Sequence, residues 1–297
     1  MTIRIALAFL LAAAPALAQL EGVIDLHVHS APDSGPRSID AIEIAQIAKR
    51  HGMRALLFKN HYTSTAPLAY LVSQAVPGIE AYGGIALNRS VGGINPAAVE
   101  HMAKTTGGLG RVVWMPTFDS EHYHRTVAPN PGFVPISRDG KLLPEVGQAL
   151  SLMAGLDLAL ATGHSAPQES LLLIRAARQA GIRRIIVTHP LLPEISMPID
   201  LQREAAGLGA FLEYPIAMAL PATKLTIEQF AQAIREVGPQ HVILTSDLGQ
   251  VLNPIHTDGL VAFLAQLREQ GFSAEQLDLM TKLNPAALLA AKRASTM

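Results

Sequence analysis

Two histidines lie one residue apart near the start of the sequence, at the end of a short apolar run. They are His27 and His29 in VIDLHVHSAPDSG, residues 23–35. In an extended strand, side chains two residues apart point to the same face. Neutral imidazole nitrogens gathered on one face are typical ligands of divalent metal ions. The spacing alone allows two interpretations: a metal-ligand pair, or two polar residues that close a strand.

The elements that would position these histidines follow from a repeated alternation of short β-rich runs and amphipathic helical patterns. The predicted strands cover residues 23–28, 55–60, 81–87, 111–116, 157–162, 184–189, 210–215 and 241–246. Helix signals lie between them: Ser38 is predicted to cap the first helix, Pro167 and Gly181 bound another, and Thr226 with Gln229 forms a capping box. Eight such units predict an α/β fold, a single (β/α)8 TIM-like barrel, with an open doubly wound sheet as the alternative.

In such a barrel the chemistry lies at the carboxyl ends of the strands, where the loops converge on one mouth. Besides His27 and His29, the polar residues at these ends are Lys59, His61, His164, His189 and Asp247. The chain has no cysteine, so a metal would be held by nitrogen and oxygen atoms alone. Burying several imidazoles and a carboxylate together is costly without a cation or full hydrogen bonding. We therefore predict one or two divalent metal ions, zinc first, with manganese, cobalt or iron as alternatives.

This order of ligands resembles the amidohydrolase superfamily of metal-dependent hydrolases. The closing segment GFSAEQLDLMTKLNPAALLA, residues 271–290, is similar to the end of that superfamily, where Asn-Pro or Asn-Ala opens the last helix. The resemblance implies that His27 and His29 bind the more buried metal with Asp247. It also implies that His164 and His189 bind a second metal or orient the substrate.

The sequence departs from the superfamily at the end of the fourth strand. Members with two metals usually carry a bridging carboxylated lysine or a glutamate there, and this strand ends in WMPT, residues 114–117. Lys59, at the end of the second strand, is the lysine nearest the predicted mouth. Cations beside a lysine favour the neutral amine that carboxylation needs. Lys59 is therefore either the bridge from a different strand or a lysine that pairs with substrate or Asp33.

A second resemblance concerns the first two strands. DLHVHSAPDSG, a helix and then MRALLFKNH also resemble the opening of the polymerase and histidinol phosphatase (PHP) family, in which an Asp-His at the end of strand two binds metal. That resemblance would make His61 a ligand. The segment LTSDLG and the NPAALL tail fit the amidohydrolase pattern better, so His61 is predicted as a ligand of second rank.

The expected activity follows from the amidohydrolase resemblance. It implies a metal-activated water that attacks an amide, lactone or ester bond of a small molecule. Asp247 would take a proton from the water and deliver it to the leaving group, and His189 would polarise the substrate oxygen. The alternatives are a phosphoesterase of PHP type, a metal-dependent decarboxylase or hydratase, and a non-catalytic exported metal-binding protein.

The remaining expectations concern export and partners. Arg4, an apolar run and Ala16-Leu17-Ala18 predict a signal peptide over residues 1–18, followed by one barrel domain over 19–297. The mature protein would be periplasmic or secreted, with no membrane span. A net charge of −1 with both signs scattered argues against nucleic acid and favours a small-molecule substrate. A homo-oligomer is left open.

One predicted connection is unusually long. Residues 117–144 carry several prolines and glycines and a turn signal at Arg138-Asp139-Gly140. Loops of this length in a compact domain are usually lids or binding loops. His122, His124 and Arg125 in this loop either contact an anionic substrate or are solvated, as polar loop residues more often are.

Overall fold

Eight parallel strands form one sheet in the computed structural model, which describes residues 20–127, 129, 132–220, 223 and 225–290. In their spatial order they are β1 (Ile24–Val28), β2 (Ala55–Phe58), β3 (Glu80–Ala86), β4 (Gly110–Trp114), β7 (Ala159–Ala161), β8 (Ile185–Val187), β9 (Phe211–Pro215) and β10 (Val242–Thr245). Each pairs with the next in this order. Each lies within a predicted strand or within one residue of it, so the eight strand predictions are confirmed.

The sheet closes on itself between its first and last strands. Asp247 N donates to His27 O at 2.9 Å, and His29 N donates to Leu248 O at 3.0 Å. A parallel bridge joins Val28 to Leu248. The single (β/α)8 barrel is therefore confirmed, and the open doubly wound sheet is not what forms.

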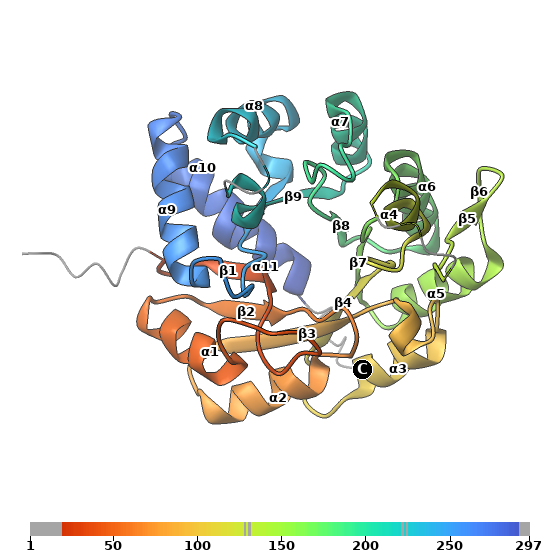
Figure 1. The fold of residues 1–297 in the computed structure, drawn as a ribbon, viewed down its shortest axis with the longest axis horizontal. Helices are drawn as coiled ribbons and strands as arrows, with labels where there is room; N and C mark the ends of the chain where they lie inside the picture. Colours follow the sequence, from red (N-terminus) through yellow and green to blue (C-terminus); the bar gives the residue numbers. More distant parts are fainter. Residues whose placement is uncertain (1–19, 128, 130–131, 221–222, 224, 291–297) are drawn as a thin grey trace, which may run out of the picture.

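A ring of helices surrounds the strands (Figure 1). The ring contains α1 (Ala41–Arg50), α2 (Ala66–Ala75), α3 (Pro96–Lys104), α5 (Pro144–Gly155), α6 (Pro167–Ala180), α7 (Ile199–Gly207), α8 (Ile227–Val237) and α9 (His256–Glu269). Helices α5 to α9 each pack against the next, and α9 packs against α1. Their buried apolar faces form the outer core with the strands.

The helix boundaries follow the expected chemistry with one correction. Gly181 ends α6 with a φ of 94°, and Thr226 and Gln229 form the capping box of α8. The prediction for Ser38 is wrong, because Asp40 is the N-cap of α1 and its carboxylate accepts from two backbone N–H groups of the first turn. A carboxylate is favoured at this position because it also complements the helix dipole.

The interior of the barrel below the mouth is apolar. Leu26, Leu57, Trp114 and their neighbours fill it, and Leu288 of the last helix packs against them. That end of the chain consists of α10 (Ala274–Asp278), η6 (Leu279–Leu283) and α11 (Asn284–Leu289). The Asn-Pro prediction for the last helix is confirmed, because α11 begins at Asn284. The Asn284 side chain donates to Val242 O at 2.7 Å, which ties α11 to the start of β10.

The long connection after β4 contains structure of its own. It includes α4 (Glu121–Thr126) and a small hairpin of β5 (Ser137–Arg138) and β6 (Lys141–Leu142). Asp139 and Gly140 have φ values of 49° and 73°, which two-residue hairpin turns require. Short helices also follow β3 and β9, namely η2 (Arg89–Val91) and η3 (Ile216–Ala219), and a third, η5 (Pro239–His241), lies between α8 and β10.

The predicted signal peptide falls within residues 1–19, outside the described part of the chain. Of the helices that the structure describes, none has the length and apolar character needed to cross a membrane.

Candidate metal centre

His27 of β1, His29 directly after it and the aspartate after β10 converge at the mouth of the barrel. Asp247 Oδ1 lies 3.0 Å from His27 Nε2 and 3.1 Å from His29 Nε2. All three residues are buried. Within the described residues, these three form the one group of potential metal-ligand atoms that lie within 4.8 Å of one another. Of the two interpretations of His27 and His29, the convergence with Asp247 therefore favours a metal-ligand pair over two polar residues that close a strand.

The backbone after β10 is shaped to bring Asp247 to this point. Asp247 has a φ of 51°, a left-handed conformation that costs a non-glycine residue about 1–3 kcal/mol. Two residues later, Gly249 lies so close to β1 that an added Cβ would be 2.0 Å from His29 O. The loop thus presses against β1 and sets the carboxylate beside the imidazoles. His189, which follows β8, is also left-handed, with a φ of 26°.

Glu213, on β9, orients His27 from the other side. Its Oε1 lies 2.7 Å from His27 Nδ1 and also accepts a hydrogen bond of 2.9 Å from Thr245 Oγ1. A carboxylate on one imidazole nitrogen fixes the ring and directs the other nitrogen toward a metal. Burial opposes a charge on His27, but the carboxylates of Asp247 and Glu213 raise the pKa of the metal-free imidazole to about 9.

Lys59, at the end of β2, lies directly on this cluster. Its Nζ is 2.9 Å from His27 Nε2 and 5.5 Å from the ring centroid of Trp114, at the end of β4. Burial lowers the pKa of Lys59, although the charges of Asp247 and Glu213 act in the opposite direction. The pairing with Asp33 is wrong, because Asp33 pairs with Arg37. Lys59 therefore reaches the centre from β2, while β4 supplies the buried Trp114.

The other three predicted histidines surround the cluster. The ring of His61 stacks on that of His29 with centroids 5.0 Å apart, and His189 stacks on His27 at 6.0 Å. His164 lies between them, with centroids 5.0 Å from His189 and 6.3 Å from His61. All three line the mouth, but their ligand atoms are not part of the tight group formed by His27, His29 and Asp247.

Burial keeps these imidazoles neutral. It lowers the pKa of His189 to about 4 and that of His29 to about 3, and it lowers the pKa values of His61 and His164 well below the ordinary 6.5. Neutral imidazole is the form that binds metal. Buried Nδ1 atoms of His29, His164 and His189 have no hydrogen-bond partner in the described structure, which is uncommon for buried polar atoms.

These observations show that the donor set fits a divalent cation. Two imidazole nitrogens and one carboxylate oxygen converge in a buried space, and one of the imidazoles is oriented by Glu213. Without a cation, the Nε2 atoms of both histidines share the single oxygen Asp247 Oδ1, at 3.0 and 3.1 Å. Nitrogen and oxygen donors suit zinc, manganese, cobalt or iron.

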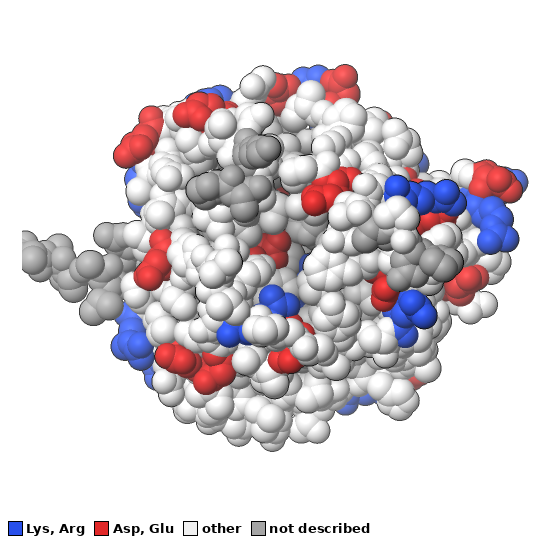
Figure 2. Space-filling model, in the orientation of Figure 1, with Lys and Arg blue, Asp and Glu red and all other residues white. Residues whose placement is uncertain are grey.

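A cavity of about 200 Å³ lies over the centre. Its lining contains Asp247, Lys59 and four of the histidines, together with Arg37, Gln250 and the apolar side chains Phe118, Leu192 and Met218. In Figure 2 this face is hollowed near its middle, with basic and acidic atoms in the hollow. The aromatic ring of Phe118 lies 4.1 Å from that of His61 and covers one side.

Several residues of this site were missed in the sequence analysis. Asp25 is buried, and its Oδ1 accepts from the backbone N–H groups of His27 and Ser246, at 3.1 and 3.0 Å. Asp25 is two residues before His27, so the strand period that paired the histidines would also have indicated it. Thr117 and Asn88 hold His61, because Thr117 Oγ1 lies 2.8 Å from His61 Nδ1 and accepts from Asn88 Nδ2 at 2.7 Å.

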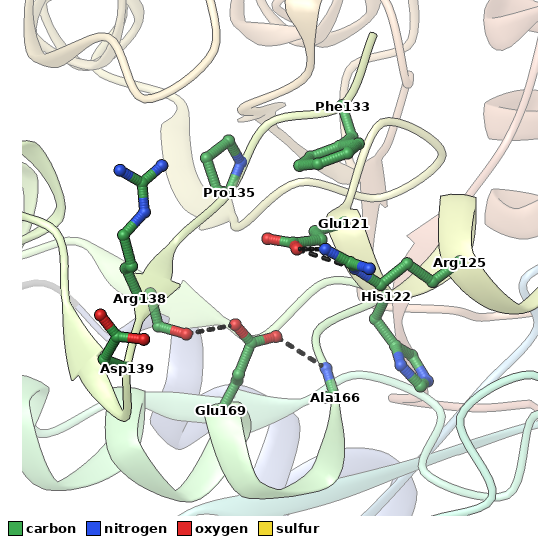
Figure 3. A pocket seen from close by; sticks show the side chains of 10 residues that line it. Glu121, His122, Arg125, Phe133, Pro135, Arg138, Asp139, Ala166 and Glu169 are labelled. Atoms are coloured by element: carbon green, nitrogen blue, oxygen red, sulfur yellow. Dashed lines mark hydrogen bonds and ion pairs between the residues drawn. The ribbon is translucent and has the colours of Figure 1, made fainter. Parts of the chain in front are cut away.

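The long connection does not bring its basic residues to the centre. His122 and Arg125 line a separate pocket of about 530 Å³, formed by α4, the β5–β6 hairpin and the start of α6 (Figure 3). We call it the flank pocket. Buried His124 lies 3.7 Å from Asp119 and belongs to the lining of neither cavity. Phe118, from the start of this connection, belongs to the lining of the cavity over the centre.

The fold and the site define a (β/α)8 barrel with a buried histidine–aspartate centre at its mouth. The chain belongs to the family described as "Family of unknown function (DUF6282)", whose model matches residues 22–213. The match includes His27 and His29 and ends before Asp247. No curated protein matches the sequence.

Solved structures share the fold at low sequence identity. One, described as molecular engineering of organophosphate hydrolysis activity from a weak promiscuous lactonase template, has a TM-score of 0.60 and 17% identity, covering 93% of this chain and 98% of its own. An amidohydrolase from Pseudomonas aeruginosa has a TM-score of 0.61 at 10% identity, covering 92% and 97%. A resiniferatoxin-binding protein from Rhodobacter sphaeroides has a TM-score of 0.60 at 14% identity, covering 92% of each chain. These likenesses support the barrel fold.

Proposed function

We propose that this protein is a divalent-metal-dependent hydrolase that acts on an ester, lactone or amide bond of a small molecule. The convergence of His27, His29 and Asp247 in a buried mouth carries this proposal. The names of two structural neighbours, a lactonase template with organophosphate hydrolysis activity and an amidohydrolase, agree with it. When bound, a divalent ion lowers the pKa of a water molecule and so supplies the nucleophile.

The chain's own residues have distinct tasks in this proposal. Oδ1 of Asp247 contacts the two histidines, so Oδ2 is free to take a proton from the water. The same oxygen then returns that proton to the leaving group. Neutral His189, in the same cavity, donates a hydrogen bond to the substrate oxygen on which negative charge develops. Glu213 holds the ring of His27, and Phe118 keeps water from one side of the cavity.

The test is a substrate panel with controlled metal content. Full-length protein would be stripped with a chelator, reloaded with zinc, manganese or cobalt, and assayed on lactones, esters, amides and phosphotriesters. We expect hydrolysis of at least one class, lost on chelation and restored by metal. Stoichiometric metal without turnover of any class would instead support the non-catalytic metal-binding alternative.

The number of ions depends on Lys59. Its Nζ lies beside His27 Nε2, where a carboxylated lysine from β2 would replace the bridge that β4 lacks. We propose this bridge, and expect Lys59→Ala to lower the bound metal from two equivalents to one in elemental analysis. Unchanged stoichiometry would show that Lys59 is not the bridge. We also propose that residues 1–18 direct export, so that the substrate is a small molecule outside the cytoplasm.

A further inference from the structure

The cavity over the metal centre contains an arginine that has no part in the mechanism above. Arg37 lies in the loop between β1 and α1 and lines the cavity together with the centre. Its side chain is 12% exposed, so most of the guanidinium stem is enclosed. Burying a guanidinium beside a site that would hold a divalent cation is costly unless an anion shares the space, and the Asp33 carboxylate is one such anion. Asp33 contacts Nε and Nη2, so the remaining edge of the guanidinium is the part of Arg37 that needs an explanation.

A carboxylate below Arg37 holds its orientation. Asp33 Oδ2 accepts from Arg37 Nε at 2.7 Å and contacts Nη2 at 2.5 Å, and the Asp33 side chain is 1% exposed. Asp33 Oδ1 accepts from Ser34 N at 2.6 Å, which fixes the carboxylate in turn. Among the described residues, the Arg37 guanidinium donates hydrogen bonds to Asp33 alone. The N–H groups at Nη1 remain available to a ligand.

The loop that carries Arg37 is also joined to the catalytic side of the barrel. Ser38 N donates to Gly249 O at 3.0 Å, two residues after Asp247. This backbone hydrogen bond joins the loop that carries Arg37 to the loop that carries Asp247. Fixed geometry of this kind lets an arginine bind a planar anion with little loss of entropy.

We propose that Arg37 binds a carboxylate of the substrate, so that the hydrolase acts on small carboxylic acids that carry the scissile ester, lactone or amide. The inference rests on the proposed function of the same site. The guanidinium edge matches a carboxylate in shape and charge. The cavity of about 200 Å³ has room for a small molecule such as a short acid. Phe118, Leu192 and Met218 would contact its carbon chain.

The test uses pairs of metal-binding probes that differ at the far end. Succinic acid monohydroxamate carries a carboxylate, and the corresponding succinamide hydroxamate is a neutral analogue of the same size. Affinities for the zinc-loaded full-length protein would be measured by calorimetry. We expect the acid to bind at least tenfold more tightly than the amide in wild type, since hydrogen bonds to charged groups contribute strongly. In Arg37→Gln the ratio should fall to about twofold or less, with the affinity of the neutral probe unchanged.

Two further variants complete the design. Arg37→Lys retains the charge without the planar edge and should give a ratio between those of wild type and Arg37→Gln, which keeps the test decisive if the glutamine variant does not fold. Arg125→Gln removes an arginine of the flank pocket and should leave the ratio at its wild-type value. A ratio that stays tenfold in both Arg37 variants would overturn the proposal.

Other outcomes separate this inference from the function on which it rests. If acid and amide bind wild type equally, the carboxylate subsite is wrong while the metal centre stands. If neither hydroxamate binds zinc-loaded protein, the metal-centre proposal fails, and this inference with it. A phosphonate probe of the same length that binds tenfold more tightly than the carboxylate would overturn the choice of carboxylate.

Discussion

Two arginines of this protein are each paired with a carboxylate four residues earlier, and they stand in very different cavities. Arg37 and Asp33 lie at the mouth, with side chains 12% and 1% exposed. Arg125 and Glu121 lie in the flank pocket, with side chains 69% and 24% exposed. The flank pocket is the larger cavity, at about 530 Å³ against about 200 Å³. Size alone would therefore select the wrong site.

The two cavities differ in how many of their polar side-chain atoms have hydrogen-bond partners within the chain. In the flank pocket, Glu169 accepts from Ser137 Oγ at 2.6 Å and from Ala166 N at 3.2 Å, so it joins the hairpin to the start of α6 (Figure 3). Arg125 is occupied by Glu121 and stacks over Phe133. At the mouth, by contrast, buried histidine nitrogens have no described partner. Buried polar atoms without a partner require an explanation such as a ligand, and the mouth contains such atoms.

The largest contrast between the cavities should appear on substitution of a carboxylate in each. Asp247→Asn removes a metal ligand and the proton acceptor, and kcat/KM should fall by about 10³-fold or more, since a general base alone contributes 10²–10⁴-fold. Glu169→Gln in the flank pocket should leave kcat/KM within about twofold. The measurement is steady-state hydrolysis of whichever substrate the panel identifies. Equal losses in both variants would remove the distinction.

Acid should lower the free energy of unfolding of the metal-free protein, because buried histidines in and near the mouth are neutral when it is folded. The folded-state pKa values of His29, His189 and His256 are lowered to about 3, 4 and 4, so below the ordinary 6.5 the unfolded chain binds more protons. The stability that these groups contribute is present above pH 6.5 and lost as the pH falls toward 4. His27, raised to about 9, acts in the opposite sense as the pH rises through 9.

Denaturant unfolding at several pH values checks this expectation. Each differing proton contributes about 1.4 kcal/mol per pH unit, so the free energy of unfolding should fall by several kcal/mol between pH 7 and 5. His189→Asn should make the slope shallower, because it removes one of the protons taken up on unfolding. A free energy that stays flat from pH 7 to 5 would contradict the buried neutral histidines.

A smaller effect is expected for the residue that orients His27. Glu213→Gln keeps the shape and loses the charge, and metal affinity should fall by about 10–100-fold, as for other carboxylates behind metal-binding histidines. The matched control is Glu121→Gln in the flank pocket, for which metal affinity should stay unchanged. Competition with a chelating dye measures both. An unaltered affinity in Glu213→Gln would mean that His27 is not oriented by this contact.

The smallest effect should come from the exposed arginine pair. Arg125→Ala removes a surface ion pair, and exposed pairs of this type contribute about 0–1 kcal/mol to stability. Thermal unfolding should therefore shift by no more than a few degrees, with zinc binding unaltered. A loss of metal binding in this variant would show that the flank pocket communicates with the centre.

The sequence predicted the frame of the site better than its interior. Strand periodicity and the order of polar strand ends indicated the barrel and brought His27, His29 and Asp247 to one mouth, because these features depend on local spacing. The pairings of Asp33 with Arg37 and of Lys59 with His27 depend on loop paths and on long side chains, which have no such period. His122 and Arg125 lie in the flank pocket, away from the centre, because the segment that was expected to be a loop contains α4 and the β5–β6 hairpin.

The metal content of the protein tests the central claim most directly. Full-length wild type, His29→Ala and His122→Ala would be dialysed against zinc, and bound metal would be measured by elemental analysis, with the emission of Trp114, the sole tryptophan, as a second signal. The account predicts at least one equivalent in wild type and in His122→Ala, and a loss of at least one equivalent in His29→Ala. Wild-type protein that binds no zinc, manganese or cobalt, or a His29→Ala variant that retains all of its metal, would contradict it.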